Sequence, residues 1–400
     1  PAYELSDHNF APSGELLFEL KAGHQLSELK SLINLYQLDI KRAFHPEAAD
    51  QTELDDFYLV DIPNDKVQHL NAIYRAFDTS NLVDWVEGNE TVQLDDPQQD
   101  LLPSRTKRSY GLNDPGVNQL WAFDEMRMDQ LYQVLADKKA KAQKKARIFI
   151  LDTGVDAQHE DLQANYRSVK KRYDKDVAGH GTHCAGIAAA VSNNNKGIAS
   201  FSLDNQYVEV SSIKVLSDFG SGTQSSIING MIEAADKGAD VISMSLGGRS
   251  NASRRRAYAQ AVAYANKKGA IVICAAGNSN MNAKDYAPAN TPGVITVSAL
   301  DTSLNRASFS NMVQDVEMGI AAPGVAIYSC YPKSKYATFN GTSMATPYVA
   351  GLVGLMKSIQ PDLDTKTAHE LLKKTGKKTS AGVQTGKFIQ PAKAVKRLLE

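Results

Sequence analysis

The stretch NGTSMATPYVAGLVGLM, Asn340–Met356, decides the fold because it joins a turn of small residues to a long apolar helix pattern. Gly341, Thr342 and Ser343 precede apolar residues at helical spacing, which predicts a buried helix that begins beside Ser343. A serine at a helix start is usually an N-cap. The same place also offers backbone N–H groups and the positive end of the helix dipole. A further role for Ser343 therefore depends on what the rest of the chain places next to it.

Composition bounds the class of protein. The chain has 400 residues, 42% of them hydrophobic, and a formal net charge of −1. Such a chain is long enough for two or three domains, and its near-neutral charge argues against nucleic acid as the main partner. The basic stretch Asp137–Arg147 lacks interleaved aromatic residues, so we interpret it as a solvated helix face or a linker. No run approaches the roughly 18 apolar residues of a membrane span, so no membrane partner is expected.

Cysteine usage and the first residues leave the cellular compartment open. Cys184, Cys274 and Cys330 fit neither a disulfide framework nor a metal-ligand spacing. One bridge stays open as an alternative, and buried free thiols are favoured. The chain begins PAYEL, without Met or a charged-then-apolar segment, so we expect that any signal segment has been removed or left out.

The first hundred residues alternate short strands and helices, which predicts a small α+β domain with a sheet backed by two helices. The polar, Pro-containing stretch 95–109 follows and is typical of a linker. Its RTKR run is either an ordinary basic linker or a protease cleavage site. The strands are expected at 14–21, 55–62 and 82–94, the last as a strand pair or one bent strand, and the helices at 25–36 and 65–77.

From about Ile148 the sequence pattern changes to nearly continuous apolar runs that alternate with amphipathic helices. This alternation predicts a parallel sheet covered on both faces. In such sheets ligands bind outside the carboxyl ends of the strands, so the residues that follow each strand are the ones to examine. The strands are expected at 147–151, 208–216, 239–246, 270–276 and 293–300, and the helices at 183–192, 225–238 and 254–269.

Polar residues with complementary chemistry follow these strands. Asp152 comes directly after one strand, Asn278 follows another, and Ser245–Gly248 follows a third. His180 and Ser343 each stand at the front of a helix. The sequence therefore predicts an aspartate, a histidine, a serine and an asparagine at one edge of one sheet.

These four residue types suit nucleophilic catalysis. A serine hydroxyl is a poor nucleophile unless a neutral histidine takes its proton, and a carboxylate must orient the imidazole. A helix N-terminus and an asparagine amide can stabilise the oxyanion that develops. The order Asp152, His180, Ser343 along the chain separates this arrangement from the serine, aspartate, histidine order of α/β-hydrolases.

The match extends to whole sequence blocks. ILDTGVDAQHEDL, GHGTHCAG, MSLGG, AAGN and NGTSMATPYVAG resemble the signature blocks of subtilisin-like serine proteases. The tract YAPANTPGVITVSALD, with RASFSN and AAPG, looks closest to the proteinase K branch. The resemblance covers about Tyr110 to the C-terminus. It implies a three-layer, doubly wound, mainly parallel α/β sheet in a peptidase domain of residues 110–400, and a serine endopeptidase that works through an acyl-enzyme.

The resemblance also implies roles for particular residues. Asp152 would orient His180, His180 would act as general base and acid, and Ser343 would be the nucleophile. Asn278 and the Ser343 backbone N–H would form the oxyanion hole. Of the two histidines in HGTH, the family pattern makes His180 catalytic and His183 a packed helix residue.

Two segments resemble the substrate-binding edges of the family. Phe219–Gly222 and Ser245–Gly248 would pair with an extended peptide on either side, so a broad substrate range is expected. Small uncharged walls suggest a large apolar or aromatic residue before the scissile bond. Thr223 and Gln224 stand where some relatives carry an aromatic residue, which puts a strongly hydrophobic outer subsite in doubt. The candidate substrate-binding residues are Gly220, Ser221, Gly222, Ser245, Leu246, Gly247, Ala275, Ala276 and Gly277.

Residues 1–94 resemble the propeptide of the family in element order and in VDWVEGNETVQ. The resemblance implies a small ferredoxin-like domain that assists folding and inhibits by laying its C-terminal tail across the active site. An unrelated small α+β domain stays the alternative. The cleavage point is open between Leu94, Leu102 and Arg108 within or beside the linker 95–109.

Structural calcium is a further implication of the resemblance. Asp161 in HEDL matches a family ligand, and SNNNKG at 192–197 resembles its partner loop in shortened form. Asp161 and Asn193 are therefore candidate calcium ligands, since calcium prefers oxygen atoms. The tight site of the proteinase K branch needs an acidic residue where this chain has Gly319, which weakens the case for that site. Carbonyls near Pro288, with Asp315 or Glu317, are the alternative donors there.

The sequence as a whole predicts a secreted or periplasmic serine endopeptidase, written as its autoinhibited proenzyme. Protein or peptide substrates, its own propeptide as inhibitor and a monomeric state are expected, with no cofactor for the chemistry. Two rivals remain. One is a catalytically silent binding or scaffold protein with the same fold, and the other is an intracellular processing or regulatory protease.

Overall fold

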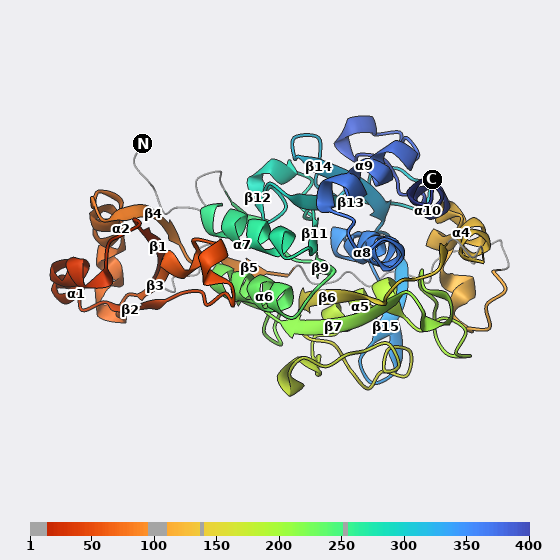
Figure 1. The fold of residues 1–400 in the computed structure, drawn as a ribbon, viewed down its shortest axis with the longest axis horizontal. Coiled ribbons are helices and arrows are strands. Elements are labelled where there is room, and N and C mark those ends of the chain that lie inside the picture. The colour runs from red at the N-terminus through yellow and green to blue at the C-terminus, as the bar shows by residue number, and fades with distance from the viewer. Residues whose placement is uncertain (1–13, 95–109, 137–139, 251–254) are drawn as a thin grey trace.

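The computed structural model describes residues 14–94, 110–136, 140–250 and 255–400. Within these residues the chain forms a small N-terminal part and a larger part that lie side by side (Figure 1). The expected linker 95–109, with the cleavage candidates Leu102 and Arg108, lies outside the described residues.

The larger part is built on a six-stranded parallel sheet with the strand order β14-β13-β11-β9-β6-β7. Its central strands are buried along their whole length, as a sheet covered on both faces requires. The five expected strands are confirmed, and β14 is an addition whose sequence, MGIAAP, has little β-branched character. The strands are β6 Ala146–Asp152, β7 Val208–Lys214, β9 Val241–Met244, β11 Ile271–Ala275, β13 Val294–Leu300 and β14 Met318–Pro323.

The sheet is doubly wound, as predicted. From β6 the chain moves outward to the edge strand β7, returns to β9 on the other side of β6, and continues through β11 and β13 to β14. The direction of winding therefore reverses beside β6. In α/β sheets the carboxyl ends of the strands at such a reversal form the usual ligand site.

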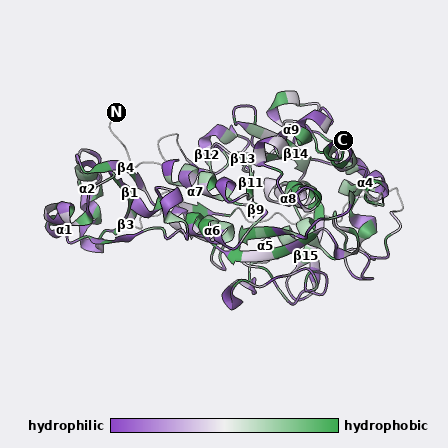
Figure 2. Cartoon of the chain, viewed as in Figure 1, coloured by the Kyte–Doolittle hydropathy of each residue, from purple (hydrophilic) through white to green (hydrophobic). Residues whose placement is uncertain are grey.

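Helices cover both faces of this sheet. α5 (His180–Ala189) and α8 (Thr342–Ile359) pack against each other and against one face, while α6 (Gln224–Asp236) and α7 (Arg256–Lys267) form a pair on the other. Figure 2 shows hydrophobic colouring on the elements that face the sheet and mostly hydrophilic colouring on the peripheral loops. The core of the larger part thus consists of two apolar layers, one on each side of the sheet.

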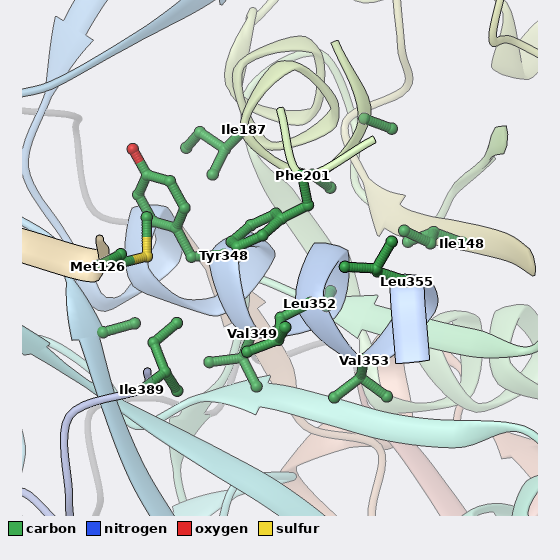
Figure 3. Close-up of a cluster of buried hydrophobic side chains, with 14 of the residues drawn as sticks. Met126, Ile148, Ile187, Phe201, Tyr348, Val349, Leu352, Val353, Leu355 and Ile389 are labelled. Atoms are coloured by element: carbon green, nitrogen blue, oxygen red, sulfur yellow. The ribbon is translucent and has the colours of Figure 1, made fainter. Parts of the chain in front are cut away.

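Every residue of α8 is buried, which explains why its sequence is apolar all round. Its side chains interleave with residues of several other elements, among them Ile148, Ile187 and Phe201 (Figure 3). A Cβ atom at Gly351 would lie 2.8 Å from the carbonyl oxygen of Ala188, so glycine lets α8 approach α5 closely. The buried helix fixes the position of its own first turn, which carries Ser343.

The N-terminal part is an antiparallel sheet of order β2-β3-β1-β4 with two helices, in the βαββαβ sequence of a ferredoxin-like fold. This agrees with the prediction. The edge strand β2 was not expected, because DIKR is mostly exposed and lacks apolar alternation. The elements are β1 Glu15–Leu20, α1 Lys30–Tyr36, β2 Asp39–Arg42, β3 Phe57–Asp61, α2 Leu70–Asp78 and β4 Val83–Gly88.

The small sheet has two apolar faces with different partners. Successive side chains of a strand point to opposite faces. Leu16 and Phe18 of β1 pack with the helices of the small part itself. Leu17, with Phe57 and Leu59 of β3, belongs instead to the apolar cluster that contains α6 and α7. The larger part therefore covers the apolar centre of one face of the small sheet, while Asp39 and Lys41 of the edge strand β2 stay exposed.

The expected element at 82–94 is two strands in two different sheets. β4 pairs with β1 in the small part, whereas β5 (Thr91–Gln93) pairs with β8 (Ser221–Thr223) of the larger part.

Cys184, Cys274 and Cys330 are buried free thiols. Among the described residues, no helix has the length and apolar character needed to cross a membrane. The remaining elements are α3 Trp121–Met126, α4 Met128–Leu135, β10 Gly248–Arg249, β12 Tyr286–Ala287, β15 Ile327–Tyr331, β16 Lys335–Phe339, α9 Thr365–Thr375 and α10 Pro391–Leu398.

Candidate active site

The four predicted catalytic residues meet at the carboxyl edge of the parallel sheet. Asp152 is the last residue of β6, His180 is the first of α5, and Ser343 is the second of α8. Asn278 follows β11 by three residues. His180, Asn278 and Ser343 line one pocket, and Asp152 is fully buried and hydrogen-bonded to His180.

The contact between Asp152 and His180 fixes the imidazole. Nδ1 of His180 lies 2.8 Å from Oδ1 and 2.9 Å from Oδ2 of Asp152. Oδ1 also accepts a hydrogen bond from the backbone N–H of Thr153 at 2.7 Å. A carboxylate that faces Nδ1 holds the proton on that nitrogen, which leaves Nε2 as the basic atom.

The start of α8 is tied to the neighbouring strand ends. The Ser343 hydroxyl donates to the carbonyl oxygen of Ser245 at 3.1 Å, and the Ser245 hydroxyl donates to the carbonyl oxygen of Ser343 at 2.7 Å. Oδ1 of Asn278 accepts from the N–H and the hydroxyl of Thr342, at 2.9 and 2.8 Å. These bonds turn the NH2 group of the Asn278 amide away from Thr342. The first N–H groups of a helix have no partner within the helix; that of Thr342 bonds to Asn278, and Ser343, the next residue, lines the pocket.

His183 has the structural position that the sequence predicted. It is fully buried, its Nε2–H donates to the carbonyl oxygen of Ala337 at 3.0 Å, and its ring stacks on Phe339 with 4.5 Å between centroids. Burial lowers the pKa of His183 to about 3. Burial also raises the pKa of the Cys184 thiol well above its usual range. Neither side chain is suited to proton transfer or nucleophilic attack near neutral pH.

One predicted substrate-binding edge already pairs with an extended segment of the chain itself. In the antiparallel β5–β8 ladder, Val92 faces Gly222 and Gln93 faces Ser221. The ladder continues past β5, where the N–H of Leu94 donates to the carbonyl oxygen of Gly220 at 2.9 Å. Leu94 lines the same pocket as His180 and Ser343.

The other predicted edge, Ser245–Gly248, lies on the opposite side of the segment Thr91–Leu94. Val92 is buried and belongs to the same apolar cluster as Leu246, and a Cβ atom at Gly248 would lie 3.7 Å from a methyl group of Val92. Ser245, Leu246, Gly247, Ala275 and Gly277 line the pocket with Leu94.

Ala276 differs from the expectation for the pocket walls. Its side chain is buried in a separate small cluster with Ala283 and Val313. Its N–H donates to the carbonyl oxygen of Val297, and its own carbonyl oxygen accepts from Asn311. These bonds orient the residue into the protein, so its neighbours Ala275 and Gly277 line the pocket without it.

Sequence reasoning missed two residues that support the site. The Thr342 hydroxyl accepts from the N–H of Gly277 at 3.2 Å while it donates to Asn278, and it thereby orients the amide. Asp176 is buried beside the start of α5, and its carboxylate accepts from Gly179 and Thr182. The only sequence signals were a threonine directly before Ser343 and an acidic residue four positions before His180.

The expected calcium ligands do not fit a cation as they are arranged. Oδ1 of Asp161 accepts from the Asn194 amide at 2.8 Å, and Oδ2 accepts from the N–H of Ile198 at 2.7 Å. Oδ1 of Asn193 accepts from the N–H of Asn113 at 3.2 Å. A calcium site needs several oxygen atoms that converge on one point. Here the Asp161 and Asn193 oxygen atoms accept from N–H groups instead.

Known proteins with similar sequences identify the family of this chain. The sequence profile described as "Subtilase family" matches residues 143–390, which is more than half of the chain. This chain belongs to the subtilase family. It is 46% identical to thermitase of Thermoactinomyces vulgaris over 218 residues, covering 53% of this chain and 75% of that protein. It is 40% identical to subtilisin DY of Bacillus licheniformis over 251 residues, covering 61% of this chain and 88% of that protein.

A solved structure supports the same assignment. A protease from Pseudoalteromonas arctica superposes with a TM-score of 0.64 at 27% sequence identity, covering 72% of this chain and all of that chain. The subtilase is therefore a serine endopeptidase that acts on peptide substrates and needs no cofactor for catalysis. The comparisons do not specify the proteinase K branch that the sequence suggested.

The hydrogen bonds of Asp161 lead to a prediction about calcium. Asp161→Asn should lower the Tm of the subtilase by the same amount in calcium and in EDTA, because it removes an acceptor for N–H groups rather than a metal ligand. Loss of one such bond to a carboxylate, with the other bond weakened because its acceptor is no longer charged, costs roughly 2–4 kcal/mol. Thermal unfolding in the two buffers measures this. A calcium-dependent rise in Tm that Asp161→Asn abolishes would show instead that Asp161 binds the cation.

The burial of His183 leads to a prediction about pH. The ordinary pKa of histidine is 6.5, and that of His183 in the fold is about 3, so below pH 6.5 the unfolded chain binds a proton that the folded chain does not. The free energy of unfolding should therefore fall by about 2 kcal/mol between pH 7 and pH 5 from this residue alone. Urea unfolding of the chain and of His183→Gln, both with Ser343→Ala to prevent self-digestion, measures the difference. Equal pH slopes for the two chains would contradict the prediction.

Proposed function

We propose that this subtilase is the autoinhibited proenzyme of a secreted, monomeric serine endopeptidase of broad specificity. Residues 1–94 would be the propeptide, 95–109 the linker that is cut on maturation, and 110–400 the peptidase domain. One observation carries the proposal: the segment Thr91–Leu94 pairs with β8 as a peptide substrate would, and it ends in the pocket that His180 and Ser343 line.

The geometry supports the following chemical roles. Nε2 of His180 takes the proton of the Ser343 hydroxyl, which turns from the Ser245 carbonyl oxygen as the substrate arrives, and Ser343 Oγ attacks the peptide carbonyl carbon. His180 then donates this proton to the leaving amine, and water hydrolyses the acyl-enzyme by the same steps. Asp152 keeps Nδ1 protonated and stabilises the imidazolium, since its carboxylate is buried against that nitrogen.

Two donors are suited to the oxyanion. The N–H of Ser343 lies in the first turn of α8, where the helix dipole is positive. The Asn278 amide presents its NH2 group because its oxygen is bound to Thr342. Donors that are fixed in advance stabilise developing charge without reorganising during the reaction.

The walls of the groove support a broad specificity. β8 binds an extended segment through backbone hydrogen bonds, which make little demand on side chains. The pocket walls Ser245–Gly247, Ala275 and Gly277 are small and uncharged, which favours a large apolar residue before the scissile bond. At the outer end the Gln224 amide donates to Glu87 of the small domain at 2.9 Å, in keeping with a polar outer subsite.

Further contacts between the two domains support autoinhibition. Oδ1 of Asn89 accepts from the N–H of Ser225 at 2.9 Å, in the first turn of α6, and the carbonyl oxygen of Glu90 accepts from the N–H of Gln224 at 2.6 Å. Arg256 at the start of α7 forms an ion pair with the buried Glu19 at 2.5 Å. The small domain thus holds Thr91–Leu94 in the groove at several points, and a domain of this kind favours export as a proenzyme.

Ser343→Ala tests the nucleophile. The variant should lose casein hydrolysis by at least about 10³-fold and should leave the segment 95–109 uncut, because the substitution removes the hydroxyl proposed to attack the peptide carbonyl. A serine-directed phosphonylating reagent should label Ser343 of the matured wild type, as shown by mass spectrometry. Ser303→Ala, at an exposed serine of the peptidase domain, is the matched control and should mature normally. Unaided maturation and casein digestion by Ser343→Ala would refute the assignment.

Val92→Asp tests the inhibitory contact. Val92 is 4% exposed, and burial of a valine side chain is worth roughly 1.5–3 kcal/mol, so the tail should bind the groove at least about tenfold more weakly. The lag before the full-length chain hydrolyses casein should shorten, as a continuous assay measures. Leu35→Asp on α1, where the side chain is 70% exposed, should keep the wild-type lag. Equal lags in all three chains would show that the paired tail does not limit activity.

A further inference from the structure

Asp176 is a buried carboxylate next to the catalytic pair but outside it. It lies on the segment before α5, and 7% of the residue is exposed. Its Oδ1 accepts from the Thr153 hydroxyl at 2.9 Å and from the N–H of Gly179 at 2.8 Å. Its Oδ2 accepts from the N–H and the hydroxyl of Thr182 at 2.9 and 2.7 Å. Thr153 directly follows Asp152, and Gly179 directly precedes His180, so Asp176 is bonded to both elements that carry the pair.

The directions of these hydrogen bonds fix the charge of Asp176. The Thr153 hydroxyl accepts from the N–H of Gly181 at 3.1 Å, and the Thr182 hydroxyl accepts from the N–H of Asp156 at 3.0 Å. Each hydroxyl therefore turns its own proton toward Asp176. Two hydroxyl protons and two N–H protons thus point at one carboxylate, which is the environment of an ionised acid. Burial opposes this and raises the pKa of Asp176 above its ordinary value, while the four donors lower the pKa and so reduce that rise.

A simple helix cap does not explain this arrangement. Asp176 does bind N–H groups at the start of α5, where an anion is favourable. Its bond to Thr153, however, reaches across to the end of β6, and Thr153 relays it to Gly181 of α5. A Cβ atom at Gly181 would lie 2.1 Å from the carbonyl oxygen of Gly154, so the two backbones are in direct contact at this point. The carboxylate closes a hydrogen-bonded ring between the strand end and the helix start.

We propose that Asp176 is a positioning residue for catalysis, which fixes the end of β6 against the start of α5 and so sets the geometry of the Asp152–His180 contact. As a second buried anion it also stabilises the imidazolium that forms on His180. This inference rests on the catalytic roles proposed above. Geometry of this kind matters because a displacement of about 1 Å at a catalytic group costs about 10²-fold in rate.

The charged groups around His180 define what a pH profile would report. Asp152 on β6 and Asp176 before α5 are the negative groups. His183 is neutral in the fold, and the buried Cys184 keeps its proton. The Lys214 ammonium, at the end of β7, donates to the carbonyl oxygen of Thr153 and pairs with Asp218 at 2.8 Å. Asp176 and Asp152 are therefore the buried anions beside the histidine, and removal of one leaves the other.

Four single variants of the full-length chain test the role. Each is matured, titrated with a serine-directed phosphonate to count folded active sites, and assayed for kcat and KM against pH with a peptide amide. Asp176→Asn replaces an acceptor oxygen by a donor. Thr153→Val removes the hydroxyl that donates to Asp176 and accepts from the N–H of Gly181, and Thr153→Ser restores it. Asp364→Ala, at the N-cap of α9 where Oδ1 accepts from the N–H of Thr367 at 2.8 Å, is the control for loss of a helix cap alone.

Asp176→Asn should lower kcat per active site by about 10- to 100-fold with less than a twofold change in KM. The midpoint of the acid limb of kcat/KM should move to lower pH by about half a unit, because the lost negative charge no longer favours a protonated imidazole. Thr153→Val should lower kcat by about 3- to 10-fold, Thr153→Ser should lie within twofold of wild type, and Asp364→Ala should lower only the Tm.

The outcomes separate the possible roles. If Asp176→Asn lowers the Tm but keeps kcat and the acid midpoint, Asp176 is a cap only and the proposal is wrong. Wild-type kcat in Thr153→Val would equally overturn the link through β6, and this comparison decides the question if Asp176→Asn does not fold. An inactive wild type would instead refute the proposed catalytic roles, which the Ser343→Ala experiment reports separately.

Discussion

The buried hydrogen bond between Asp152 and His180 is the interaction on which the rest of the structure depends. A carboxylate with no exposed surface is costly unless hydrogen bonds compensate its charge. Here the compensation comes from an imidazole on one element and from an N–H at the end of another. The pair therefore forms only when the end of β6 and the start of α5 meet, which requires the doubly wound sheet and the helices packed on its face. The same hydrogen bonds that make burial of the Asp152 carboxylate possible therefore also orient the His180 imidazole.

The same backbone groups serve the two states that we propose for this enzyme. β8 binds β5 through main-chain hydrogen bonds, and these are the groups that an extended substrate would use. An inhibitor of this kind needs no special chemistry, only a tail of suitable length held at a high local concentration by the docked domain. Covalent linkage and the contacts of α6 and α7 supply that concentration, so a single cut in the linker changes it.

The sequence predicted the central sheet, and it selected candidate catalytic residues that the fold brings together, because both depend on local pattern. Apolar runs and the residues after them identify β6, β9 and β11, and the turn before α8 identifies Ser343. The sequence did not predict contacts that depend on which distant residues the fold brings next to a side chain. The pairing of Thr91–Gln93 with β8, the bond between Asp176 and Thr153 and the N–H donors around Asp161 all depend on groups distant in the sequence. Ala276 was misplaced because a one-residue change along an irregular segment reverses the direction of a side chain.

The small domain has a core on one face of its sheet only, because Leu17, Phe57 and Leu59 on the other face are covered by the larger domain. Once separated, the fragment would present this apolar face to water, and a domain of fewer than 100 residues that loses this burial is only marginally stable. Such a fragment would unfold and be digested faster than it could bind again. Maturation would then be irreversible, because the released small domain would no longer be folded and could not bind the peptidase domain again.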